Sequence, residues 1–199
     1  MKVLIACEFS GIVRDAFRAR GHDALSCDLL PTEINGPHYQ GDVQDILNDS
    51  WDLMIAHPPC TYLCVSGARW FKDRQVEQAQ ALDFVRCLLN ANIPHIALEN
   101  PISVISSHIR KPDQIVTPFM FGHGCTKKTC LWLKNLPKLK ATNSVEPMYA
   151  FTRSGKRYDA WWLWTSSLPT KGGVRSAARS RTFRGIADAM AEQWGGLAT

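Results

Sequence analysis

The stretch Asp52-Leu-Met-Ile-Ala-His-Pro-Pro-Cys60 places a cysteine just after a short apolar run. A second stretch, His95-Ile-Ala-Leu-Glu-Asn-Pro101, places an acid and an amide just after another. Apolar runs of this length are typical of buried strands in a parallel sheet. Because ligands bind at the carboxyl ends of the strands in open α/β sheets, we expect Cys60, Glu99 and Asn100 in one pocket.

Apolar patterns elsewhere in the chain alternate between strand-like and helix-like stretches. Such alternation favours an α/β fold, with a mostly parallel sheet and helices on both faces. The segment 134–175 breaks the alternation and shows no regular period, while 31–41 has the composition of a loop. The pattern predicts strands at 2–6, 23–26, 52–56, 95–98 and 128–133, and helices at 12–20, 74–90 and 180–194.

Length and composition indicate a soluble globular protein. The chain of 199 residues suits one compact domain, and 45% apolar with 21% charged residues is ordinary for that class. No apolar stretch approaches the roughly 20 residues that a membrane span requires. The N-terminus lacks the cleavage pattern of a signal peptide. We therefore expect a cytoplasmic protein without a membrane partner.

The seven cysteines do not form the pattern of a disulfide framework. Such frameworks belong to short secreted chains with even cysteine counts, and we expect most of these thiols to be small core residues. His123, Cys125 and Cys130 lie close together in sequence, but their spacing is not that of a standard zinc site. No metal site is therefore predicted.

Basic residues gather towards the C-terminus of a chain whose formal charge is +5. A mild positive charge is compatible with a polyanionic partner. Two interpretations of the cluster remain open, a solvated face and a surface that contacts phosphate groups. The residues predicted for phosphate contact are Lys171, Arg175, Arg179 and Arg181.

The turn Phe9-Ser10-Gly11 separates the first predicted strand from the first predicted helix. A glycine at this place lets a ligand approach the backbone and the helix N-terminus. The three-glycine fingerprint of dinucleotide sites is absent, because Val13 and Arg14 stand where further glycines would be expected. Taken alone, the turn favours an ordinary connection between a strand and a helix.

Two acids occupy positions where nucleotide-binding α/β domains hold their ligand. Asp28 ends the second predicted strand, and an acid about 20 residues after the glycine turn binds ribose hydroxyls in those domains. Asp42 follows Gly41 and could bind an adenine amino group. An aspartate that caps a loop or a helix is the alternative interpretation of Asp42.

The residues after the two central strands have the chemistry of a covalent catalyst. Pro58 and Pro59 stop the strand and stiffen the segment that presents Cys60. A cysteine nucleophile needs a lowered pKa or an activating group, and the alternative for Cys60 is an inert buried thiol. Glu99 ends an apolar strand, where a carboxyl group needs partners. It could activate a heterocycle through a ring nitrogen, or it could cap the following helix.

The order of these motifs resembles that of the DNA cytosine-5 methyltransferase family. The family's F-x-G turn is matched by 9–11, and its two cofactor-contacting acids by Asp28 and Asp42. Its Pro-Cys and Glu-Asn motifs are matched by Pro59–Cys60 and Glu99–Asn100. The resemblance covers residues 2–133 and the last helix, whose predicted position matches the family's final motif.

Several positions depart from the family pattern. The basic strand motif Q-x-R-x-R falls on 126–130 in degenerate form, with Lys128 for the first arginine and Cys130 for the second. Thr61 follows the cysteine where the family usually has glutamine. Cys7 and Glu8 precede the turn where an aspartate or a similar residue is expected.

The resemblance implies an S-adenosylmethionine-dependent enzyme with a Rossmann-like core. Cys60 would attack C6 of cytosine, and Glu99 would hydrogen-bond or protonate N3. Asn100 would position the Pro-Cys loop or the base, and Lys128 would contact a phosphate or the base O2. The cofactor would contact Phe9, Ser10, Gly11, Asp28, Asp42 and Pro59.

The resemblance also implies a division of the chain. Residues 1–133 and 176–199 would form the catalytic core, and 134–175 would be a reduced target-recognition segment. Such a minimal core suggests a small phage or prophage member of the family, acting in the cytoplasm of a bacterium or of a phage-infected host cell. Lys171, Arg175, Arg179 and Arg181 would contact DNA.

Three functions remain open at this point. The first is methylation of cytosine in DNA, and the second is methylation of a free deoxycytidine nucleotide, which the short recognition segment favours. The third is a non-catalytic DNA-binding or regulatory protein on the same fold. Trp161, Trp162 and Trp164 would either stack on bases or fill a small core.

Overall fold

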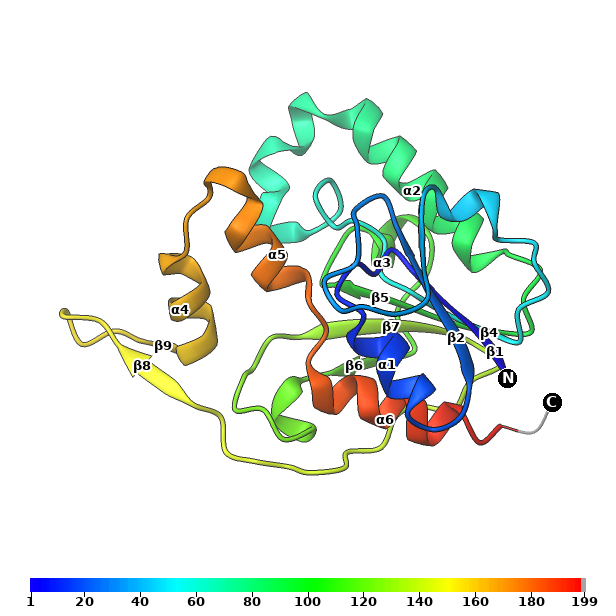
Figure 1. The fold of residues 1–199 in the computed structure, drawn as a ribbon. Helices are drawn as coiled ribbons and strands as arrows, with labels where there is room; N and C mark the ends of the chain where they lie inside the picture. The colour runs from blue at the N-terminus through cyan, green and yellow to red at the C-terminus, as the bar shows by residue number, and fades with distance from the viewer. Residues whose placement is uncertain (198–199) are drawn as a thin grey trace.

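A seven-stranded sheet in the order β3-β2-β1-β4-β5-β7-β6 forms the centre of the protein, whose computed structural model describes residues 1–197 (Figure 1). Strands β1 to β5 run parallel to one another, whereas β7 is antiparallel to both β5 and β6. The predicted α/β fold with a mostly parallel sheet is therefore confirmed. The strands are β1 (Lys2–Ala6), β2 (Asp23–Asp28), β3 (His38–Gln40), β4 (Leu53–Ala56), β5 (His95–Pro101), β6 (Gln114–Val116) and β7 (Thr129–Lys134).

Helices cover both faces of the sheet because the central strands are apolar on both sides. On one face, α1 (Ile12–Arg18) and α6 (Arg184–Trp194) pack on a core that includes Val3, Leu53 and Leu131. On the other, α2 (Gln75–Leu89) and the short α3 (Ile105–His108) pack on a core that includes Leu4 and Met54. Alternate residues of one strand thus serve two separate apolar layers.

Several predicted boundaries differ from the structure. The predicted loop 31–41 contains β3, and β6 was not predicted at all. The first helix ends at Arg18, two residues before its predicted end. Short 3-10 helices are η1 (Val43–Asp45), η2 (Val65–Asp73) and η3 (Pro118–Met120). Within residues 1–197, no helix combines the length and the apolar character that crossing a membrane would require.

The segment 134–175, which shows no period in sequence, is nevertheless ordered. A hairpin of β8 (Tyr149–Phe151) and β9 (Arg157–Asp159) leads into α4 (Ala160–Ser167), and both project away from the sheet (Figure 1). Turn η4 (Lys171–Gly173) and helix α5 (Val174–Ser180) follow. The predicted boundary at residue 176 falls inside α5, and the predicted helix 180–194 begins only at Arg184. Residues 198–199 of the predicted core lie outside the described part.

Candidate active site

The register of β4 and β5 brings the two chemical motifs together. Ala56 pairs with Leu98, so the next residue of each strand, His57 and Glu99, lie side by side. His57 Nδ1 lies 3.3 Å from Glu99 Oε2. Cys60 follows three residues after His57 and is near enough for the charge of Glu99 to act on its thiol.

Glu99 is held as a carboxylate. Burial by itself raises the pKa of this group, but the hydrogen bond with His57, the positive charge of Lys127 and the hydroxyl of Thr129 outweigh it. The pKa of Glu99 is therefore lowered from its ordinary value. The free site holds Glu99 in its ionised form at neutral pH. Glu99 must therefore take up a proton when a ligand binds before it can donate one.

Cys60 is exposed as a residue, yet its thiol is not a ready nucleophile. Burial of the sulfur raises its pKa, and Cys64 and Glu99 raise it further, whereas Lys127 lowers it. At neutral pH the group is mainly a thiol, and thiolate formation depends on the balance between Glu99 and Lys127. Neutralising Glu99 would remove one of the three contributions that raise the pKa of this thiol, the other two being burial and Cys64.

Asn100 points away from Glu99, because neighbouring strand residues face opposite sides of a sheet. Its side chain is 1% exposed, and its Nδ2 donates a hydrogen bond of 2.9 Å to the Pro58 carbonyl. This bond fixes the proline segment that carries Cys60. Among the described residues, Asn100 Oδ1 and two neighbouring buried atoms, His57 Nε2 and Ser103 Oγ, have no hydrogen-bond partner.

The structure brings Lys127, rather than the predicted Lys128, to this site. The positive charge of Lys127 lowers the pKa of both Cys60 and Glu99. Lys128 is exposed, and it is the alternate residue of the extended chain. The Lys127 ammonium donates a hydrogen bond of 2.9 Å to the Arg179 carbonyl and lies 5.6 Å from the Trp161 ring centroid. Lys127 shares the parity of Leu131, which pairs with Glu99, and this register is known only from the structure.

A cavity of about 260 Å³ opens at the carboxyl ends of β1 and β2, next to the Pro-Cys segment. Three of the residues predicted to contact a cofactor line it: Asp28, Asp42 and Pro59. Sequence reasoning missed the rest of the wall, since its members are apolar, thiol or amide side chains without a motif. These are Cys7, Cys27, Leu29, Gly41, Val43, Gln44 and Phe84.

The polar groups of this cavity are partly satisfied within the chain. Asp28 Oδ1 accepts a hydrogen bond of 2.9 Å from the Leu30 amide, and Asp28 Oδ2 has no hydrogen-bond partner among the described residues. Asp42 caps η1, because its Oδ1 accepts a hydrogen bond of 2.9 Å from the Gln44 amide. Asp42 is therefore a capping aspartate that also lines the cavity. Burial raises the pKa of Cys27 to about 12, which keeps that thiol neutral.

The glycine turn does not line the cavity. Glu8, 4% exposed, occupies the N-terminus of α1, where its carboxylate accepts hydrogen bonds from the amides of Val13 at 2.7 Å and Arg14 at 3.2 Å and from the Ser10 hydroxyl. Gly11 adopts a left-handed φ of 74° and packs against the buried Arg14 guanidinium. Phe9, Ser10 and Gly11 therefore form a self-capped turn beside the site, with their helix amides already occupied.

The four basic residues predicted for DNA contact are not equally free. Arg175 donates to the Leu168 carbonyl, and Arg179 donates to the Thr165 and Ser166 hydroxyls, so both join α5 to α4. Arg181 forms an ion pair with Glu33, with Nε 2.7 Å from Oε2. Lys171 is exposed on η4. Most of this cluster therefore has a structural task within the chain.

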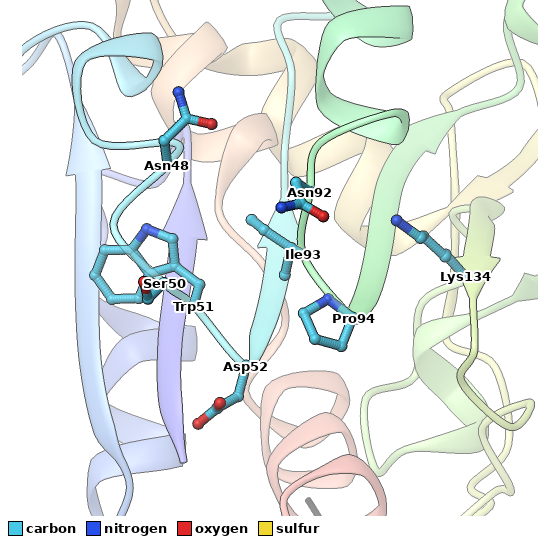
Figure 2. Close-up of a pocket in the computed structure, with 8 residues that line it drawn as sticks. All are labelled: Asn48, Ser50, Trp51, Asp52, Asn92, Ile93, Pro94 and Lys134. Atoms are coloured by element: carbon cyan, nitrogen blue, oxygen red, sulfur yellow. The ribbon is translucent and has the colours of Figure 1, made fainter.

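Another hollow lies at the opposite edge of the sheet. It has a volume of about 490 Å³ and is lined by Asp52, Pro94 and Lys134, among others, at the amino ends of β4 and β5 (Figure 2). No predicted site residue lines it. Ligands of open α/β sheets bind at the opposite, carboxyl edge, so the cavity beside Pro59 is the candidate site. Among the described residues, no three His, Cys, Asp or Glu side chains gather to hold a metal.

Comparison with known proteins adds no identity to this geometry. No protein-family model matches the chain. A search of curated proteins likewise finds no significant match. What the protein does is therefore inferred from the site itself.

Proposed function

We propose that the protein transfers a methyl group from S-adenosylmethionine to C5 of cytosine in DNA, with Cys60 as the nucleophile. One observation carries this proposal. The cavity that holds Asp28 and Asp42 is walled by Pro59, and the next residue is Cys60. A nucleoside-sized cofactor site and a covalent catalyst are thus joined by one peptide bond.

The cavity fits the nucleoside half of the cofactor. The unpaired oxygen of Asp28 suits a ribose hydroxyl, and Leu29, Val43 and Phe84 offer apolar surface to an adenine ring. The helix amides that often bind an anionic group are taken by Glu8. The amino-acid half would therefore be held by other groups than the turn 9–11. When bound, the cofactor would supply a methyl group from its sulfonium centre.

Catalysis begins at the sulfur of Cys60. The thiolate would add to C6 of cytosine, and the electron pair of the C5–C6 bond would form the bond from C5 to the methyl carbon, whose bond to the sulfonium sulfur would break with its electron pair left on that sulfur. Lys127 favours the thiolate, and Asn100 keeps the proline segment in place through Pro58. Loss of the C5 proton to water and cleavage of the carbon–sulfur bond then restore the thiolate and the aromatic ring.

Glu99 assists by hydrogen-bonding to the cytosine ring and by sharing a proton with it. As a carboxylate, it accepts a hydrogen bond from the exocyclic amino group of the base. A bound base excludes water from the Glu99 carboxylate and so raises the pKa of Glu99. The raised pKa favours a proton shared between Glu99 and N3 of the base. Protonation of Glu99 would also remove one of the contributions that raise the pKa of Cys60, beside burial and Cys64, so base binding would favour the thiolate.

A second substrate is supported by one observation. Arg175, Arg179 and Arg181 are engaged within the chain, so the α5 region offers fewer phosphate contacts than its sequence suggests. A free deoxycytidine nucleotide needs only one phosphate contact. The same chemistry on that smaller substrate is the alternative function.

Both substrates can be tested in one experiment. The protein is incubated with S-adenosylmethionine carrying a labelled methyl group, together with unmethylated DNA, dCMP or dCTP. Label recovered as 5-methylcytosine in DNA supports the proposal, and label in the nucleotide supports the alternative. Cys60→Ala should abolish transfer, whereas Cys87→Ala on α2 should leave it unchanged. Transfer that survives in Cys60→Ala contradicts the assigned nucleophile.

A further inference from the structure

The β8–β9 hairpin presents a sheet face that the other described residues leave largely exposed. Ala150 and Tyr158 are paired and face α4, where the Tyr158 ring stacks on Trp162 at 5.0 Å with an interplanar angle of 12°. The opposite face therefore carries Tyr149, Phe151 and Arg157, together with Asp159, whose carboxylate is bonded to the amides of Thr126 and Trp162. Tyr149 is 42% exposed and Phe151 is 67% exposed. The hairpin projects from the body of the molecule (Figure 1).

The exposed face combines aromatic rings with positive charge. The Arg157 guanidinium lies 4.4 Å from the Tyr149 ring centroid, and Phe151 pairs with Arg157 across the hairpin. Residues 149–157 include Arg153, Lys156 and Arg157 and no acid. In the part of the chain that the structure describes, none of the ion pairs includes these three residues. No described carboxylate therefore neutralises their charge, although Arg157 lies over the Tyr149 ring and Lys156 lies 5.1 Å from the Tyr158 ring centroid.

We infer that this face, defined by Tyr149, Phe151 and Arg157, binds single-stranded nucleic acid. Aromatic rings two residues apart on a strand are about 7 Å apart, which allows successive unstacked bases to lie one on each ring. Arg157 and its basic neighbours would contact the phosphates between them. A duplex offers base edges rather than base faces, so the rings favour an unpaired strand.

The inference does not depend on methyl transfer. The hairpin contains none of the residues assigned to the chemistry, and stacking on aromatic rings requires no particular base. If the proposed function also holds, an unpaired cytosine would reach Cys60 without the unstacking that a duplex requires.

Binding is tested by fluorescence anisotropy with fluorescein-labelled oligothymidylate, without cofactor, and with the same strand paired to oligoadenylate. We expect the single strand to bind more tightly than the duplex. The double variant Tyr149→Ala/Phe151→Ala should weaken binding about tenfold or more. Arg157→Gln should reduce the slope of log affinity against log salt by about 0.7.

Matched variants separate these effects from unfolding. Tyr149→Phe and Phe151→Tyr keep the rings and should bind as the wild type does. Ile115→Ala and Lys111→Gln remove exposed apolar surface and charge outside the hairpin and should have no effect. Circular dichroism verifies the fold of each variant. Equal affinity of the double alanine variant and the wild type, tighter binding of the duplex, or no binding at low salt would each overturn the inference. Because oligothymidylate lacks cytosine, none of these results bears on methyl transfer.

Discussion

At the scale of single residues, burial and nearby charges set the protonation of the Cys60 thiol. Burial, Cys64 and Glu99 raise the pKa of Cys60 and Lys127 lowers it, while His57 and Lys127 keep Glu99 ionised. In the free protein Cys60 is therefore mostly protonated. Loss of the charge on Glu99 would lower the pKa of Cys60.

This balance predicts how Cys60 reacts with iodoacetamide. Because its pKa is raised, alkylation should increase with pH only in a range above that of an ordinary thiol. Glu99→Gln removes one of the contributions that raise this pKa, so alkylation at neutral pH should become faster by a factor of about three. Lys127→Met should slow it. The rate is measured on the peptide that contains Cys60 by mass spectrometry, and unchanged or slower alkylation in Glu99→Gln would refute the balance.

At the scale of elements, α1 begins on a buried carboxylate instead of a ligand. Glu8 satisfies the amides of Val13 and Arg14, and it orders Ser10 in the turn. This arrangement accounts for Glu8 before the turn, where the family that the sequence resembles has an aspartate or a similar residue. It also accounts for Val13 and Arg14 at positions where the three-glycine fingerprint has glycines. The turn is a closed structural unit.

The role of Glu8 can be measured as stability. Glu8→Ala leaves two buried amides without an acceptor, so the free energy of unfolding should fall by about 1–3 kcal/mol. Glu8→Gln retains one acceptor oxygen and should lose less. Urea denaturation of both variants gives the comparison, and an Ala variant as stable as the wild type would show that water replaces the cap.

Sequence patterns predicted the long elements better than the short ones. Strands β1, β4 and β5 have continuous apolar runs, whereas β3 and β6 have three residues each and exist because they pair with β2 and β7. Cys60 and Glu99 could be predicted to share an edge because both follow such runs. The choice of Lys127 over Lys128 depends on the phase of β7 against β5, which composition does not reveal.

At the scale of the whole molecule, the segment 134–175 is tied to the core at several points. Asp159 caps α4 and accepts a hydrogen bond of 2.6 Å from the amide of Thr126, just before β7. The Met148 amide donates to the Gly124 carbonyl, and the Lys140 amide donates to Gln193 Oε1. Because Thr126 directly precedes Lys127, the hairpin that carries the proposed nucleic-acid face is joined to the segment that brings Lys127 to the site.

The proposed covalent step can be trapped directly. With S-adenosylmethionine and an oligonucleotide that contains 5-fluorocytosine, the C5 position carries fluorine in place of the proton that must leave, so the sulfur cannot be eliminated. We predict a covalent protein–DNA complex that requires the cofactor, maps to Cys60 by mass spectrometry and is absent in Cys60→Ala. Failure of the wild type to form this complex with single-stranded or duplex DNA, or its formation through another residue, would contradict methyl transfer to DNA through Cys60.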